Sequence, residues 1–248
     1  MTQAALLELD HVFKRFGSIV VADGLSLEVR PSDAVGIVGP NGAGKSSLFS
    51  LISGDLAPNA GDIRFESRSV NRIDSAERCR LGIGRTYQVP RSFENMTVFE
   101  NVLVAAFRGA GLRGDRADEL AAKTLADTGL LAMANRPASR LGLLGRKRLE
   151  LARALAAQPK LLLLDEVAAG LTDPEVGQLV EIVAGVRARG VAVIWVEHVV
   201  RALVDFVDRL ICLAGGRFIG DGEPRAVLRS TAVREVFLGT GYIEAPGS

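Results

Sequence analysis

The chain has 248 residues, of which 48% are hydrophobic and 24% are charged. This balance is typical of globular proteins and excludes a disordered or fibrous chain. A chain of this length buries roughly 70–75% of the surface that it exposes when unfolded, so it needs neither disulfides nor a structural metal to hold its fold. The 30 basic and 29 acidic side chains leave a net charge of +1. This indicates no polyanion-binding face, and we expect no nucleic-acid partner.

Cysteine usage and hydropathy indicate the compartment. The two cysteines are far apart in the sequence and form no CxxC pair, which favours a reduced, cytosolic protein. Residues 1–10 lack the basic and apolar regions of a signal peptide. The apolar runs at 161–164 and 191–196 are too short to span a bilayer, and charged residues interrupt the run at 199–214. We therefore expect a soluble chain that exercises any membrane role through partners.

The first part of the chain predicts strands before its first helix. Residues 6–29 and 63–65 alternate and are rich in β-branched side chains, which indicates an antiparallel edge sheet. Residues 34–38 form a continuous apolar run that ends at a glycine, as buried strands do. A helix is expected over residues 45–52, ending where Gly54 can adopt the left-handed conformation of a C-cap.

The rest of the chain alternates between helical and apolar segments. Residues 97–157 are rich in Ala and Leu and predict a helical subdomain without a strand. Buried strands at 161–164 and 191–196 flank a helix that starts at Asp173, and the core-facing positions of this helix are Val176, Leu179, Val180 and Val183. We therefore expect one α/β domain over residues 1–248 with a largely parallel sheet. Its core and its helical subdomain are expected at residues 1–96 with 158–248, and at 97–157.

A phosphate-binding pattern follows the first predicted buried strand. Residues 39–46 match G-x-x-x-x-G-K-[ST], in which glycines let backbone N–H groups converge on phosphate oxygens. Lys45 supplies a mobile charge for the β- and γ-phosphates, and the Ser46 hydroxyl can ligate Mg²⁺. A chance Gly-rich turn is the alternative, but the pattern lies between a strand and a helix, as a phosphate loop requires. The predicted nucleotide-binding residues of this loop are Gly39, Asn41, Gly42, Ala43, Gly44, Lys45, Ser46 and Ser47.

Two carboxylates follow the predicted strand at 161–164. Asp165 lies at the strand end beside the phosphate loop, where it can hold Mg²⁺ directly or through water. Glu166 is then placed to act as general base toward an attacking water. Solvated acids are the alternative for this pair alone, and the upstream phosphate loop favours the catalytic interpretation. His198 can contact the γ-phosphate or the water, and Gln88 can contact Mg²⁺ or water, although single residues of these types are more often structural.

Taken together, these residues resemble the ATP-binding cassette of ABC transporters over nearly the whole chain. The resemblance implies a P-loop NTPase fold with a mostly parallel sheet core, an N-terminal antiparallel β part and an inserted helical subdomain, which binds ATP and Mg²⁺. It implies that Phe16 stacks on the adenine. It also implies that Ser46, Gln88 and Asp165 contact the metal and that Glu166, His198 and Gln88 are catalytic, with Gln88 in the glutamine loop and His198 as the switch histidine.

Four segments resemble, more narrowly, the ATPase subunits of branched-chain amino acid importers, a group with relatives that import urea and short amides. These segments are residues 82–88, 96–102, 148–155 and 233–239. The likeness implies a cytoplasmic subunit, peripheral on the inner face of the cell membrane, that hydrolyses ATP beneath two membrane permeases. A second ABC ATPase, either a different chain or a copy, would pair with it. An extracytoplasmic solute-binding protein would deliver the solute.

The signature motif of the family, Leu-Ser-Gly-Gly-Gln, is eroded in this chain. In a dimer of cassettes this loop binds the γ-phosphate held by the other subunit, but Gly142 offers no hydroxyl and Leu144 places a side chain where close backbone approach is wanted. The motif falls on Leu141, Gly142, Leu143, Leu144 and Gly145. We therefore hypothesise an asymmetric pair, in which a partner's intact signature completes the competent site. Restoring Ser at 142 and Gly at 144 is expected to raise turnover at the weaker site.

Residues next to these motifs have two interpretations each. The basic run at 146–148 could lend positive charge to the signature helix, but a solvated helical face is the better interpretation. Phe93 and Met96 are explained equally well as a groove for a permease helix and as local packing, whereas Phe99 is expected in the core.

Two other classes of function stay open at this point. A cassette ATPase without a transporter, such as one that serves iron–sulfur cluster assembly, would have a similar length and differ only in its partners. A regulatory cassette that hydrolyses little ATP would agree with the eroded signature, although Glu166 and His198 favour a retained catalytic set.

Overall fold

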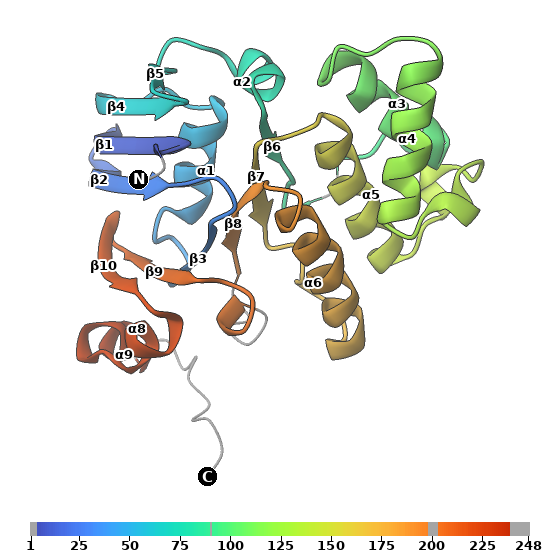
Figure 1. Ribbon diagram of the computed structural model, residues 1–248. Helices are drawn as coiled ribbons and strands as arrows, with labels where there is room; N and C mark the ends of the chain where they lie inside the picture. Colours follow the sequence, from blue (N-terminus) through green and yellow to red (C-terminus); the bar gives the residue numbers. More distant parts are fainter. Residues whose placement is uncertain (1–3, 90, 198–202, 239–248) are drawn as a thin grey trace.

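The computed structural model describes residues 4–89, 91–197 and 203–238. Two β-sheets and the helices around them form an α/β architecture, with a group of helices to one side (Figure 1). Among the described residues, no helix is both long enough and apolar enough to pass through a bilayer.

The N-terminal strands form a separate antiparallel sheet. Its order is β2-β1-β4-β5, so the antiparallel part expected from the sequence is present, as a sheet of its own rather than as an edge of the main one. The buried residues of these strands alternate with exposed ones, because only one face of this sheet lies against the core. The strands are β1 (Leu7–Phe16), β2 (Ile19–Val29), β4 (Ala60–Phe65) and β5 (Arg68–Ser69).

The main sheet has the order β10-β9-β3-β8-β7-β6, and its strands are parallel except for β10, which runs antiparallel to β9. Every residue of β3, β7 and β8 is buried, as expected for strands covered on both faces. Because parallel strands end at the same edge, the loops after β3 and β7 lie together there. The strands are β3 (Ala34–Val38), β6 (Ile83–Arg85), β7 (Leu161–Asp165), β8 (Ala192–Val196), β9 (Arg209–Ala214) and β10 (Arg217–Gly222).

Each face of the main sheet has its own hydrophobic core. One core joins the sheet to helix α1 (Lys45–Ser53) and to the antiparallel sheet. The other lies beneath α6 (Asp173–Arg187), α8 (Pro224–Arg229) and α9 (Thr231–Leu238). The predicted strands and helices of the core are confirmed, with β8 beginning one residue later than expected. Helix α6 buries Leu179, Val183 and Val186, so its apolar stripe faces the sheet as predicted.

The expected helical region contains α3 (Val98–Arg108), α4 (Asp115–Asp127) and α5 (Leu143–Ala156), which share a third hydrophobic core. Helix α5 belongs to two cores at once. Leu149 and Ala152 pack against α3 and α4, whereas Leu151 and Ala154 pack against the main sheet. This helix therefore joins the helical region to the sheet.

A buried arginine completes the end of α1. The helix stops at Gly54, whose φ of 87° is left-handed, as the sequence predicts. Arg78, from α2 (Ser75–Leu81), is 1% exposed. Its guanidinium donates hydrogen bonds to carbonyl oxygens that lie 2.6 to 3.0 Å away, those of Leu51, Ile52, Val70 and Ile73. Two of these carbonyls belong to the last turn of α1, where helical partners are missing.

Candidate functional site

The phosphate loop needs its glycines for space. It connects the end of β3 to the start of α1, and Gly44 has a φ of 107°. A Cβ atom at Gly44 would lie 2.3 Å from the carbonyl oxygen of Val21, and one at Gly39 would lie 2.0 Å from that of Leu213. No side chain fits at either position, so the backbone N–H groups of the loop remain accessible to an anion.

The side chain of Lys45 lies at the base of this loop and is bonded to the loop backbone. Its ammonium donates to the carbonyl oxygens of Gly39 at 2.7 Å and Pro40 at 2.9 Å, and the residue is 6% exposed. Burial lowers the pKa of Lys45, while the nearby carboxylates of Glu166 and Asp165 act in the opposite direction. Ser46, next to it, is exposed. The predicted loop residues are thus brought together at the positive end of α1.

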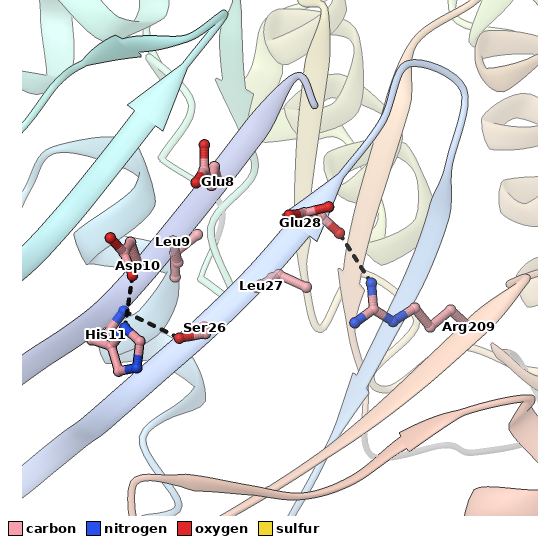
Figure 2. Close-up of a pocket in the computed structure, with 8 residues that line it drawn as sticks. All are labelled: Glu8, Leu9, Asp10, His11, Ser26, Leu27, Glu28 and Arg209. Carbon is pink, nitrogen blue, oxygen red and sulfur yellow. Dashed lines mark hydrogen bonds and ion pairs between the residues drawn. The ribbon is translucent and has the colours of Figure 1, made fainter. Parts of the chain in front are cut away.

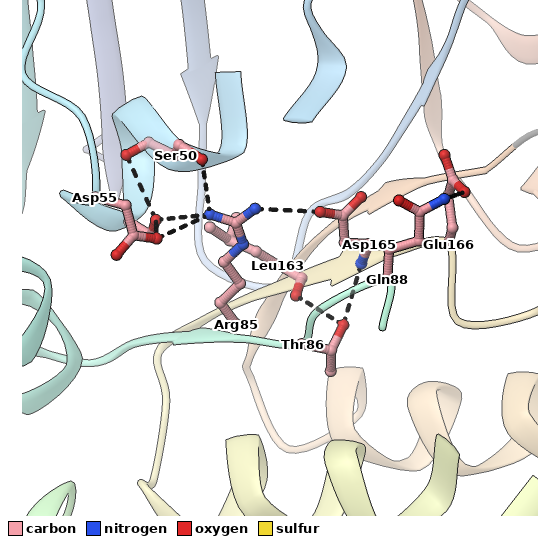
Figure 3. Close-up of polar contacts among 9 residues, drawn as sticks. Ser50, Asp55, Arg85, Thr86, Gln88, Leu163, Asp165 and Glu166 are labelled. Atoms are coloured by element: carbon pink, nitrogen blue, oxygen red, sulfur yellow. Dashed lines mark hydrogen bonds and ion pairs between the residues drawn. The ribbon is translucent and has the colours of Figure 1, made fainter. Parts of the chain in front are cut away.

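The predicted carboxylates lie at the same edge of the sheet (Figure 3). Asp165 is 4% exposed, and its Oδ2 accepts a hydrogen bond from Arg85 at 3.1 Å. Its backbone N–H donates to the hydroxyl of Thr86, so the end of β6 holds both the side chain and the backbone of this residue. Burial raises the pKa of Asp165, and the Arg85 guanidinium counteracts that shift.

Glu166 and Gln88 are in direct contact. Gln88 Nε2 donates to Glu166 Oε2 at 2.6 Å. Glu166 has a φ of 50°, which is unusual for a residue with a side chain, and its backbone N–H donates to Val196 on the neighbouring strand. Glu166 is 7% exposed and Gln88 is exposed. The glutamine therefore lies at the surface of the site and holds the carboxylate of the predicted general base.

Lys147 is buried, which corrects the interpretation of residues 146–148 as a solvated face. It is 4% exposed, and its ammonium donates to the carbonyl oxygen of Glu166 at 2.9 Å and, at 3.4 Å, to that of Gln88. Burial lowers the pKa of Lys147. Leu144, Leu151 and Ala154 lie on the same helical face and pack against the main sheet. That spacing was the available signal that Lys147 faces inward. Arg146 is exposed, as expected.

The signature residues surround the start of α5. Leu141 is buried in the helical core, and Gly142 is the N-cap residue, without a side-chain hydrogen bond. Leu144 is half-buried and packs against the core beneath the main sheet, whereas Leu143 is 43% exposed. Of these two leucines, Leu143 is therefore the one with an exposed side chain. Gly145 lies within the first turn of the helix.

Other predicted residues lie farther from this cluster. Phe16 is 48% exposed at the end of β1, with the Lys14 ammonium 5.2 Å from its ring centroid. Its ring is accessible, as stacking on adenine requires. Phe93 is 44% exposed beneath the Arg153 guanidinium, and Phe99 packs against the helical core. His198 lies outside the described residues.

The acidic edge, formed by Asp165 and Glu166, has a chemistry that would suit a magnesium ion shared with nucleotide phosphates. The described residues contain no group of three His, Cys, Asp or Glu side chains able to hold a metal. However, Asp165 Oδ1 is buried, and no hydrogen-bond donor among the described residues reaches it. One carboxylate oxygen, the exposed Ser46 hydroxyl and phosphate oxygens form a donor set of the kind that Mg²⁺ takes in nucleotide sites.

A separate groove of about 390 Å³ lies on the antiparallel sheet (Figure 2). His11 is bonded to Asp10 and Ser26 along one side, and Arg209 donates to the carbonyl oxygen of Glu28 on the other. None of the residues that line it belongs to the phosphate loop or to the acidic edge. This groove is therefore not part of the predicted nucleotide site.

A phosphate loop after one parallel strand, with an aspartate at the end of the next strand but one in the same sheet, is typical of a P-loop nucleotide-binding protein. Comparison with known proteins narrows the class, because residues 22–169 match the model of the ABC transporter family. The chain belongs to this family, and it is an ATPase of that family. The predicted family and fold class are confirmed.

Two relatives and one solved structure place the chain within the family. The chain is 34% identical to the high-affinity branched-chain amino acid transport ATP-binding protein LivG of Salmonella typhimurium, over 94% of this chain and 98% of LivG. It is 33% identical, with the same coverage, to BraF of Pseudomonas aeruginosa, which carries the same description. The ADP conformation of MJ1267, an ATP-binding cassette of an ABC transporter, superposes with a TM-score of 0.88 at 29% identity, covering 96% of this chain and 100% of MJ1267.

Proposed function

We propose that this chain is the ATP-hydrolysing, energy-coupling subunit of an importer for branched-chain amino acids or related small amino acid and amide solutes. The observation that carries the proposal is that the phosphate loop, Asp165, Glu166 and Gln88 lie together at one edge of the main sheet. The relatives named for branched-chain amino acid transport support the class of solute.

The geometry suggests how these residues would act. The loop amides and the positive end of α1 would bind the phosphates. Lys45 would exchange its contacts with Gly39 and Pro40 for the β- and γ-phosphates. Ser46, Gln88 and Asp165 would hold Mg²⁺, which supplies neutralisation of phosphate charge when bound.

Glu166 would accept the proton of the attacking water. In the structure its Oε2 accepts a hydrogen bond from Gln88, so this oxygen is occupied by the amide. Gln88 must therefore turn away from Glu166 before hydrolysis, for instance toward the metal and the water. The same residue would thus release the base and complete the metal site.

Partner proteins complete the proposal. The chain would bind two membrane permeases on the inner face of the cell membrane and pair with a second ABC ATPase, while a solute-binding protein delivers the solute outside. Its signature loop would approach the nucleotide of the second ATPase. That loop offers no hydroxyl at Gly142 and exposes Leu143, which supports an asymmetric pair with one stronger and one weaker site.

The Glu166→Gln variant tests hydrolysis at this site. Without the general base, ATP should remain uncleaved, so the purified variant and its partner ATPase should form a stable ATP-bound dimer in gel filtration, with little phosphate released. A phosphate-release rate equal to that of the wild type would instead contradict the assigned role and favour a regulatory cassette.

Purification from detergent-solubilised membranes tests the partners. A tagged chain should bring down two polytopic permeases and a second cassette ATPase, identified by mass spectrometry. Recovery of the chain without any membrane protein would exclude the importer and favour a cassette that works without a transporter.

A further inference from the structure

Arg85 lies at the centre of the site although no phosphate-loop or carboxylate motif contains it. It is the last residue of β6, and its side chain is 9% exposed. Because β6 pairs with β7 and Arg85 lies opposite Leu163, its side chain reaches the end of β7, where the acidic pair begins. There, Nη2 donates to Asp165 Oδ2 at 3.1 Å.

The other arm of the guanidinium is bonded to the helix that follows the phosphate loop. Nη1 lies 3.1 Å from the hydroxyl of Ser50, 3.0 Å from that of Ser53 and 3.0 Å from Asp55 Oδ2. Figure 3 shows the two arms directed to opposite sides, one toward α1 and one toward Asp165. A single side chain therefore connects the helix of the phosphate loop to the acidic edge.

Two aromatic rings restrict the position of this guanidinium further. Its central carbon lies 5.7 Å from the ring centroid of Phe49 and 4.9 Å from that of Tyr87. Both distances fall within the range of cation–π contacts. With hydrogen bonds at both ends and rings beside it, the guanidinium has few other positions, and the single ammonium group of a lysine could not reproduce the fork.

We propose that Arg85 is a positioning residue, which orients the Asp165 carboxylate toward the cation of the bound nucleotide. Arg85 occupies Oδ2, whereas no described donor reaches the buried Oδ1, so one oxygen of defined orientation is left for the metal. By holding α1 as well, Arg85 fixes how far Asp165 lies from Lys45 and Ser46 at the start of that helix. The inference rests on the proposed role of Asp165 as a cation ligand.

The direction in which Mg²⁺ binding changes when Arg85 is removed distinguishes positioning from simple electrostatics. The positive charge of Arg85 repels a nearby cation, so if charge were its only contribution, removing it would strengthen Mg²⁺ binding. If Arg85 orients the carboxylate, removing it leaves Asp165 Oδ2 without its donor and the oxygen for the metal without a fixed direction. Mg²⁺ binding then becomes weaker.

The test measures the Kd of adenylyl imidodiphosphate for the full-length chain by calorimetry, once with excess Mg²⁺ and once with EDTA. The ratio of the Kd in EDTA to the Kd with Mg²⁺ reports how many fold the metal strengthens nucleotide binding. We expect Arg85→Met to lower this ratio by about tenfold, as found for outer partners of metal ligands, and to leave the Kd in EDTA unchanged. Arg85→Lys should lie between Arg85→Met and the wild type.

Arg209→Met is the matched control, because Arg209 is also a partly buried arginine paired with a carboxylate, that of Asp221, but it contacts no residue of the site. Both methionine variants should lower the melting temperature, and only Arg85→Met should change the ratio. A purely structural role for Arg85 would leave the ratio at the wild-type value. If Arg85→Met does not fold, Arg85→Lys decides, since an unchanged ratio in that variant refutes positioning.

Asp165→Asn separates this inference from the proposed function. If it keeps the wild-type ratio, Asp165 is not a cation ligand and the proposed role fails. If Asp165→Asn lowers the ratio while Arg85→Met leaves it unchanged or raises it, the role of Asp165 stands and the inference about Arg85 is refuted.

Discussion

Arg78→Met should destabilise the protein far more than the loss of a surface arginine. Arg78 donates hydrogen bonds to four carbonyl oxygens, each of which is worth about 1.5–3 kcal/mol when the donor is charged. Against this, burial lowers the pKa of Arg78 from its ordinary value to about 10, which corresponds to roughly 3 kcal/mol of disfavoured charge. Because water can reach some of the freed carbonyls, we expect a net loss near the low end of the difference between these two contributions, about 3–5 kcal/mol.

Urea unfolding followed by circular dichroism would measure this loss as a shift of the midpoint at constant slope. Arg64→Met is the control, because Arg64 pairs with Glu8 and Asp62 but has 38% of its side chain exposed. Exposed ion pairs contribute about 0–1 kcal/mol, so this variant should stay within that range. If Arg78→Met also lost less than about 1 kcal/mol, the four carbonyls would not depend on the guanidinium, and the reasoning from buried acceptors would be refuted.

Two further predictions concern the signature and the pH dependence of stability. Gly142→Ser combined with Leu143→Gly should raise the ATPase rate of the chain assembled with its partner ATPase, and an unchanged rate would show that the eroded signature does not limit turnover. Hydrogen bonds from the backbone and hydroxyl of Thr97 lower the pKa of Glu100 from its ordinary value. This stabilisation is present above the unfolded pKa and is lost as the pH falls through the folded one. Between pH 6 and pH 3 the melting temperature of the wild type should therefore fall further than that of Glu100→Gln. Equal falls would show that the Glu100 carboxylate does not stabilise the first turn of α3, where it bonds to the N-cap residue Thr97.

The core strands could be predicted because burial on both faces leaves a continuous apolar run in the sequence. Residues 34–38 and 161–164 are such runs, and β3 and β7 form there. Strand β9 contains a similar apolar run at 210–214, whereas β10 has no equally clear signal. Charged Arg209 begins β9 and pairs with Asp221 on β10, so an ion pair also joins the two strands of this hairpin. That contact is visible only in three dimensions.

The candidate site likewise contains some residues that the sequence predicts and one that it does not. The loop at 39–46, Asp165 and Glu166 are predictable, because phosphate binding requires short, contiguous patterns. Arg85 is different, since its hydrogen-bond partners lie 30 to 80 positions away in the sequence and none repeats with a helical or strand period. Its role depends on the alignment of β6 with β7, which no local pattern encodes.

Lys147 connects the helical region to Glu166 and Gln88 at the edge of the main sheet. Helix α5 begins at the signature, where it would meet a partner subunit, and one turn later Lys147 donates to the carbonyl oxygens of Glu166 and Gln88. A buried ammonium cannot leave these acceptors without an energetic penalty, because no water replaces them. Any displacement of α5 must therefore either move the two carbonyls with it or break both bonds. A movement at the start of α5 would in this way be linked to Glu166 and Gln88 of the same chain.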